Sequence, residues 1–140
     1  MKSTKELEHN IKRIISEKIP NINFQDINFL EGNDNSPEGI YVFARNDKYV
    51  FLFTEKGKIR DIKEMSNETE VLWNVLNSVL NDLAMEYAIS NKQTGKDFRR
   101  ILFSKEIELF SLFGDDLKKR KIKEIDNVLL KNPYNDAQRE

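Results

Sequence analysis

The chain has 140 residues, of which 39% are hydrophobic, and a formal net charge of -1. That length suits one compact domain with its own core, and the near-neutral charge gives no general attraction to nucleic acid or anionic membranes. With no cysteine and one histidine, His9, the sequence excludes disulfides, thiolate metal sites and multi-histidine metal sites. We predict a single domain over residues 1–136, a frayed C-terminus at residues 137–140, and no metal or cofactor.

Location and charge distribution give two further expectations. No apolar run reaches the roughly 18 residues of a membrane span, and the first residues lead into a charged amphipathic segment, so we expect a cytoplasmic protein. Residues 1–90 contain 11 Lys and Arg against 15 Asp and Glu, whereas residues 91–140 contain 12 against 9. The net -4 of the first 90 residues suits a basic partner, and nucleases are one such class.

A first helix is predicted near the N-terminus. It begins at Ser3 or Thr4, because Ser3 and Glu6 have the spacing of a capping box. Apolar residues follow at helical spacing up to Pro20: Leu7, Ile11, Ile14, Ile15 and Ile19. Since His9 lies off this stripe, we expect it to be a solvated surface histidine.

A sheet is predicted next. Residues 24–30 form either a short strand or an extended connection, and residues 31–39 form a plain loop, since their Asp and Asn residues lack the order of a calcium loop. Residues 40–45 and 48–54 are rich in β-branched and aromatic residues and flank a short turn, and a second turn leads to residues 59–62. These three segments predict an antiparallel meander that needs a helical cover.

Three helices are predicted after the sheet, over residues 66–90, 97–114 and 115–132. Apolar residues spread around the first of them up to Tyr87 and Ile89, so we expect a buried central helix. The predicted fold is therefore α+β: an N-terminal helix, a short three-stranded antiparallel meander, and three C-terminal helices packed as a helical layer.

Two features of these helices have both a structural and a binding interpretation. Trp73 either fills the core near a helix start or anchors a partner, because tryptophan dominates interface hot spots. Asp97 lies three residues before Arg100 on the same helix face, where the two form an intrahelical ion pair or contact a partner.

The basic run at residues 118–123 is either a phosphate-binding patch or a solvated helix face. Acids flank it on both sides and it contains no aromatic residue, which favours the solvated face. The phosphate interpretation defines the alternative function, a small nucleic-acid-associated or regulatory binding protein. A small enzyme with a carboxylate site is a third alternative, but no catalytic motif supports it, so we expect no enzyme.

Short motifs are spread over residues 66–136. They are Trp73, Tyr87, Asp97-x-Arg99-Arg100-x-x-Phe103, Glu108-Leu109, Glu124-Ile125 and Asn132-Pro133-Tyr134-x-Asp136. Together they resemble small immunity proteins of bacterial polymorphic-toxin systems, contact-dependent growth inhibition among them. The Arg-Arg-x-x-Phe segment and the Pro-Tyr-x-Asp ending are the most specific part of the resemblance.

The resemblance implies a protein that binds a cognate toxin domain, such as a nuclease, in the cytoplasm and blocks its activity without catalysis. Its partner surface would combine acidic side chains with aromatic anchors. The candidate partner-binding residues are Trp73, Asp97, Arg100, Tyr134 and Asp136. In the competing structural account, the last two dock the C-terminal turn onto Arg99 or Arg100 and seal the helical core.

Overall fold

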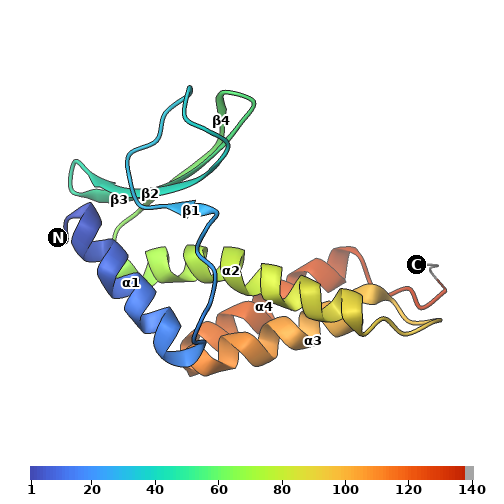
Figure 1. Ribbon diagram of the computed structural model, residues 1–140. Coiled ribbons are helices and arrows are strands. Elements are labelled where there is room, and N and C mark those ends of the chain that lie inside the picture. The colour runs from blue at the N-terminus through green and yellow to red at the C-terminus, as the bar shows by residue number, and fades with distance from the viewer. Residues whose placement is uncertain (138–140) are drawn as a thin grey trace. The chain divides into compact units, whose positions relative to one another are not determined.

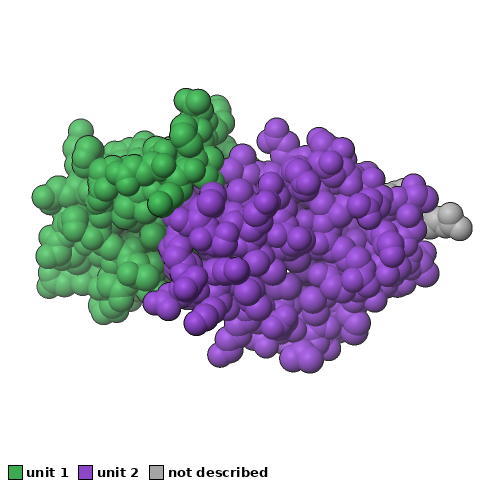
Figure 2. Space-filling view, turned by 90° about the horizontal axis from the view of Figure 1, so that it is seen from below, with its two compact units in different colours: residues 1–75 green, residues 76–140 purple. Residues whose placement is uncertain are grey.

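The computed structural model describes residues 1–137 and has an α+β fold (Figure 1). Within these residues it contains four α-helices and a four-stranded mixed sheet. The chain divides into two compact units, Met1–Val75 and Leu76–Glu140, which Figure 2 colours separately. The single domain over residues 1–136 stays a prediction, and residues 138–140 of the expected frayed end lie outside the described residues.

The first unit begins with α1, Thr4–Lys18, whose start agrees with the sequence. The Ser3 hydroxyl accepts a hydrogen bond from the backbone N–H of Glu6 at 3.2 Å, and the Glu6 carboxylate accepts one from the N–H of Ser3 at 2.9 Å. The predicted capping box is thus confirmed, because each residue satisfies a backbone donor that the helix leaves unpaired. The helix ends before Pro20, and its buried residues are Leu7, Ile11 and Ile15.

The sheet has the strand order β1-β2-β3-β4. Its strands are β1 Ile27–Asn28, β2 Gly39–Arg45, β3 Lys48–Glu55 and β4 Lys58–Met65. The last three strands form the predicted antiparallel meander, but β1 adds a fourth strand that runs parallel to β2. The expectation of a purely antiparallel three-stranded sheet was therefore wrong. Two residues are too few for a strand periodicity, and the amide of Asn28 holds β1 in place by donating to the carbonyl of Ile40 at 3.0 Å.

The loop between β1 and β2 folds back over one face of the sheet (Figure 1). The Pro37 carbonyl accepts hydrogen bonds from the Tyr41 hydroxyl at 2.6 Å and from the Thr54 hydroxyl at 2.8 Å. The Asp34 carboxylate accepts the N–H of Ile59 at 2.9 Å. Residues 31–38 form a loop, as predicted, and these hydrogen bonds hold it against the sheet. Residues 1–137 contain no group of three or more His, Cys, Asp or Glu that could hold a metal ion.

The central helix α2, Glu68–Ser90, spans the end of the first unit and the start of the second. Its predicted N-cap is present, since the side chain of Asn67 accepts the N–H of Glu70 at 3.0 Å. Its C-terminal turns are less buried than predicted, because Tyr87 is 44% exposed and Ile89 57% exposed. Across the part of the chain that the structure describes, no helix is both long and apolar enough to span a membrane.

Two more helices complete the second unit. They are α3, Phe98–Phe110, and α4, Asp115–Lys131, separated by the 3-10 turn η1, Ser111–Phe113. The prediction of one continuous helix over residues 97–114 was wrong in this detail, because the chain tightens after Phe110 and reverses at Gly114, where φ is 104°. Small residues of α2, Ala84 and Ala88, pack with Leu102 of α3 in the core of this unit.

Candidate partner-binding site

Asp97 is the N-cap of α3 and the centre of a polar cluster in the second unit. One carboxylate oxygen, Oδ1, accepts the N–H of Arg99 at 2.9 Å. The other, Oδ2, accepts the Arg99 guanidinium and the N–H of Asn135, each at 2.9 Å. Although Asp97 is only 1% exposed, these bonds from Arg99 and Asn135 hold its pKa well below the usual range, so this buried carboxylate is ionised.

Arg99 attaches the end of α4 to the start of α3. Its Nη1 donates to the carbonyl of Asn132 at 2.8 Å, and its Nη2 donates to the carbonyl of Pro133 at 2.9 Å. Asn132 is the C-cap of α4, and helix ends leave carbonyls without helical partners. The guanidinium of Arg99 therefore supplies donors to two carbonyls at the end of α4, and the carboxylate of Asp97 neutralises the positive charge of Arg99.

Arg100 makes a two-point ion pair with Asp136. The Nε–Oδ1 distance is 2.8 Å and the Nη2–Oδ2 distance is 3.0 Å. Asp136 also accepts the N–H of Asp97 at 2.9 Å, and the bonds from Arg100 and Asp97 lower its pKa to about 2. The expected Asp97–Arg100 intrahelical pair was wrong, because Asp97 bonds to Arg99 and Arg100 turns to the C-terminal segment.

Tyr134 packs its ring beneath the two arginines. The guanidinium carbon of Arg100 lies 4.2 Å from the ring centroid and that of Arg99 lies 5.5 Å away, which are cation–π distances. The ring of Phe103 lies 6.4 Å from the same ring. Partial burial raises the pKa of the Tyr134 hydroxyl, so this side chain is neutral at physiological pH.

We call Asp97, Arg99, Arg100, Tyr134 and Asp136 the C-terminal cluster. This cluster brings together four of the five predicted partner-binding residues. In it the C-terminal turn is docked onto Arg99 and Arg100, as the structural account expects. The fifth residue, Trp73, belongs to the first unit and is 6% exposed, so it presents little surface. A partner role for these residues stays a prediction.

A surface groove of about 500 Å³ shares Arg100 with the C-terminal cluster. The residues lining this α2/α3 groove are Tyr87, Asn91, Gln93, Arg100, Ile101, Ser104, Lys105 and Glu108. Lys105 Nζ lies 4.3 Å from the centroid of the exposed Tyr87 ring and 2.6 Å from a carboxylate oxygen of Glu108. The groove therefore contains an accessible tyrosine and an arginine, two residue types that are enriched at the hot spots of protein interfaces.

Sequence reasoning assigned Tyr87 to the apolar stripe of a buried helix and so missed this groove. The available signal was its position four residues before Asn91, where the helical pattern stops. A tyrosine in the last turn of a helix can leave its ring at the surface because the chain after it turns away. The amide of Asn91 donates to the Tyr87 carbonyl at 2.8 Å and closes that last turn.

A comparison with protein families matches residues 46–127, more than half of the chain, to the family described as Immunity protein 63. The chain belongs to the Immunity protein 63 family. This match confirms the resemblance to immunity proteins of polymorphic-toxin systems and supports a general toxin-neutralising role. It also suggests an inhibitor that is not an enzyme. Comparisons with curated proteins and with solved structures found no match.

The matched segment of this immunity protein contains the whole α2/α3 groove and the part of the C-terminal cluster that lies on α3. Tyr134 and Asp136 lie beyond it. The segment also contains the basic run at residues 118–123. We expected its side chains to be solvated, and for Lys121 this expectation was wrong. That side chain is 3% exposed and therefore points into the protein.

Lys121 belongs to a buried polar network between α2, α3 and α4 of the immunity protein's second unit. Its Nζ donates to Asn77 at 2.6 Å and to Glu124 at 2.5 Å, and lies 3.6 Å from a carboxylate oxygen of Glu106. Glu106 is 5% exposed, and burial raises the pKa of its carboxyl although the nearby lysine opposes this shift. The network links the three helices, and it leaves the charge of Lys121 buried and paired, so this lysine does not contribute to a basic surface.

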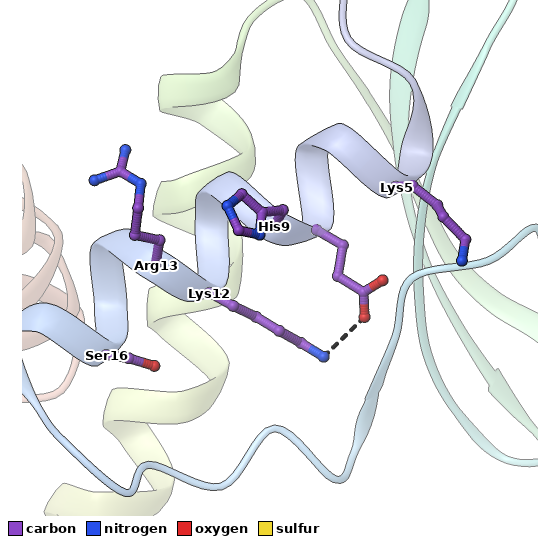
Figure 3. A pocket seen from close by; sticks show the side chains of 6 residues that line it. Lys5, His9, Lys12, Arg13 and Ser16 are labelled. Carbon is purple, nitrogen blue, oxygen red and sulfur yellow. Dashed lines mark hydrogen bonds and ion pairs between the residues drawn. The ribbon is translucent and has the colours of Figure 1, made fainter.

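A second hollow of the immunity protein, in the first unit, lies along α1 (Figure 3). Its lining residues are Lys5, Glu8, His9, Lys12, Arg13 and Ser16. His9 is exposed, as predicted, and Lys12 pairs with Glu8 at 2.8 Å. Lys12 Nζ also lies within 5.7 Å of the Phe24 and Phe29 ring centroids. These contacts describe a solvated helix face on which Lys12 is paired, while Lys5, Lys12 and Arg13 outnumber the one acid, Glu8.

Proposed function

We propose that this protein binds a cognate toxin domain in the cytoplasm and blocks its activity by occupying the surface that the toxin needs, without catalysis. The observation that carries the proposal is the match to the Immunity protein 63 family over residues 46–127.

The proposed toxin-binding surface is the α2/α3 groove. Hot spots of protein interfaces are enriched in Tyr and Arg that partners can bury, and the groove offers both in Tyr87 and Arg100. Tyr87 is 44% exposed, and the side chain of Arg100 is 45% exposed although it is paired. Because Lys105 and Asp136 already fix these two side chains, little conformational entropy is lost when a partner covers them.

The other predicted residues then do not contact the toxin themselves but support the residues that do. Asp97, Tyr134 and Asp136 hold the Arg100 side chain and the C-terminal turn in position, and Trp73 stabilises the interior of the first unit. Substituting a positioning residue should weaken toxin binding through the mobility of Arg100. Substituting Tyr87 or Arg100 removes contact area directly.

We further propose that the toxin has a basic surface, and that a nuclease fits best. This surface is attracted by the acidic first 90 residues and not by the α2/α3 groove, where Arg100 and Lys105 outnumber Glu108. Residues 1–90 carry a net charge of -4, and complementary charge accelerates association with a basic protein. The acidic residues of the loop before β2 contribute to this charge. A nuclease surface that binds phosphates has the opposite sign.

Co-expression tests the proposal. The chain is expressed together with a candidate toxin domain of a polymorphic-toxin system. The two are co-purified in about 1 M salt, where exposed charges are largely screened, and growth of the cells is recorded. We expect a stable one-to-one complex and rescued growth, because much of a stable interface is apolar. If growth is not rescued and no complex survives, the proposal is wrong.

The same experiment separates the alternative function. Nucleic-acid binding through residues 118–123 would be lost with rising salt as counterions re-associate. Burial of Lys121 among Asn77, Glu106 and Glu124 removes one of the five cations of that run, so no observation favours this alternative.

A further inference from the structure

The two edges of the sheet differ. On one side, β1 pairs with the start of β2, and the hydroxyl of Thr4 accepts the N–H of Ala44 at 3.0 Å farther along the same strand. On the other side, β4 has β3 as its one strand neighbour within the described sheet. Alternate backbone N–H and C=O groups of an antiparallel edge strand point away from the sheet. Near the start of the eight-residue strand β4 the N–H of Ile59 is already bonded to Asp34, so the open hydrogen-bonding edge is the segment that follows, at residues 60–64.

The side chains of β4 are also exposed. Residues 60–64 are all at the surface, and Ile62 is 49% exposed although it lies opposite the buried Leu52. The side chains of Asp61 and Lys63 are 55% and 52% exposed, and their 4.0 Å contact is at the limit of an ion pair. Ile62 thus lies in the middle of the open edge. Its neighbour Asp61 is only weakly paired, whereas Lys63 also donates a hydrogen bond to Asn74 at 3.4 Å.

The charges of β4 are self-complementary when the strand is reversed. The sequence is Arg60-Asp61-Ile62-Lys63-Glu64, so an antiparallel copy centred on Ile62 places each acid opposite a base. Asp61 then faces Lys63 of the second copy, and Lys63 faces Asp61 of the second copy. Arg60 and Glu64 are also of opposite charge at the outer positions, although the strand is irregular at Arg60, and the Ile62 residues of the two copies face each other at the centre.

We propose that β4 pairs antiparallel with β4 of a second copy of this chain around a two-fold axis through Ile62. The two sheets then form one continuous sheet, and each copy uses the same surface, as closed two-fold symmetry requires. Opposite charges directly across an antiparallel pair stabilise it, and the central Ile62 pair buries apolar surface.

Charged residues on an edge strand ordinarily prevent pairing with other strands. A strand of arbitrary sequence would place like charges opposite some residues of β4, which disfavours pairing. The reversed copy of β4 places opposite charges there, so the same residues disfavour other strands and favour this one. Arg60 is itself the residue of the β-bulge, because β3 passes from Phe53 opposite Asp61 to Thr54 opposite Ile59. The central pairs of Asp61 with Lys63 lie beyond the bulge and carry the register.

Charge reversal followed by charge restoration tests the dimer. The molar mass of the isolated full chain is measured by light scattering over a wide concentration range. We expect a shift from one copy to two as concentration rises. Asp61→Lys places lysine opposite lysine twice and should weaken association about tenfold, since it converts two favourable cross-strand pairs into unfavourable ones. The double variant Asp61→Lys/Lys63→Asp recreates both opposite pairs and should restore association.

Lys56→Glu is the matched control, because it reverses an exposed charge in the β3–β4 turn outside the paired segment. It should leave association unchanged. A mass of one copy at every concentration would overturn the proposal. So would a dimer that Asp61→Lys does not weaken or that the double variant does not restore. No toxin is present in these measurements, so their outcome is independent of the proposed function.

Discussion

The guanidinium of Arg100 and the carboxylate of Asp136 form a two-point contact between residues 36 positions apart in the sequence. Both side chains are partly exposed, at 45% and 38%, so water screens their attraction. Asp136 gains a further bond from the N–H of Asp97, and the pair therefore acts with the N-terminus of α3 as one unit. Its effect is to fix the C-terminal turn beside the α2/α3 groove.

Removal of the Asp97 carboxylate should destabilise the second unit. Asp97→Ala loses the helix cap and leaves Arg99 and the N–H of Asn135 without their acceptor, which together cost about 2–4 kcal/mol. Asp97→Asn keeps one oxygen acceptor and should lose less. Urea unfolding followed by helical circular dichroism measures both. Asp126→Ala, an exposed change on α4, is the control, and equal losses in Asp97→Ala and this control would contradict the prediction.

Acid should release the C-terminal turn. The folded-state pKa values of Asp97 and Asp136 are depressed, that of Asp136 to about 2, below the value of about 3.9 for an unfolded aspartate. Their stabilisation is thus fully present above pH ~4 and is lost as pH falls from there through the folded pKa values. The amide NMR signals of Asp97 and Asn135, which donate to these carboxylates, should shift over this interval.

The variant Asp136→Asn serves as the comparison for the acid titration. It cannot lose a negative charge at position 136, so the Asp97 amide signal should change less between pH ~4 and ~2 than in the unmodified chain. If the titration curves of the two proteins coincide, the depressed pKa of Asp136 does not stabilise the turn.

Local signals in the sequence were sufficient for the ends of several elements. The Ser3–Glu6 capping box, the Asn67 cap and the Asn132–Pro133 stop each depend on residues within four positions of one another, and the structure has all three. The meander was predictable for the same reason, because adjacent strands joined by short turns need no distant partner.

Features that depend on distant residues were not predictable in this way. Lys121 looks like a solvated cation in its own helix, and its burial depends on Glu106 and Asn77, which lie 15 and 44 positions earlier. Arg100 had a nearby acid in Asp97 and still pairs with Asp136. The pattern of charges along a helix shows only the possible partners within one turn. Tertiary packing adds partners from distant parts of the chain and determines which ion pair forms.

Replacing one member of the buried Lys121–Glu106 pair should lower the free energy of unfolding more than replacing both members with uncharged residues. Lys121→Ala leaves the Glu106 carboxylate buried without its cation, at a cost of about 3–5 kcal/mol. The double variant Glu106→Gln/Lys121→Met removes both charges and should recover most of that loss. Lys119→Ala changes an exposed lysine of the same helix and is the control for urea unfolding. A double variant no more stable than Lys121→Ala would show that the charge pair is not the cause.

A methyl group at Gly32 should destabilise the first unit. A Cβ built there lies 2.5 Å from Cγ and 2.6 Å from Cδ1 of the Tyr41 ring, so the covering loop must move away from the sheet, at a cost of about 1–3 kcal/mol. Gly57→Ala is a matched loop control with no atom within 4 Å, where the cost of about 1 kcal/mol comes from its φ of 75°. Trp73 fluorescence during urea unfolding reports on this unit. A smaller loss for Gly32→Ala than for Gly57→Ala would show that the loop does not pack tightly on Tyr41.

Substitution of Tyr87 should separate toxin binding from folding. The ring is 44% exposed, so Tyr87→Ala should change the free energy of unfolding little, whereas loss of a central aromatic anchor should weaken toxin binding at least about tenfold. Leu130→Ala is the control, since Leu130 is 80% exposed and apolar but does not line the groove. Titration calorimetry with a catalytically inactive toxin domain measures both affinities. If the two variants bind alike while the unmodified chain still rescues growth, the immunity function stands and the toxin binds a surface other than the α2/α3 groove.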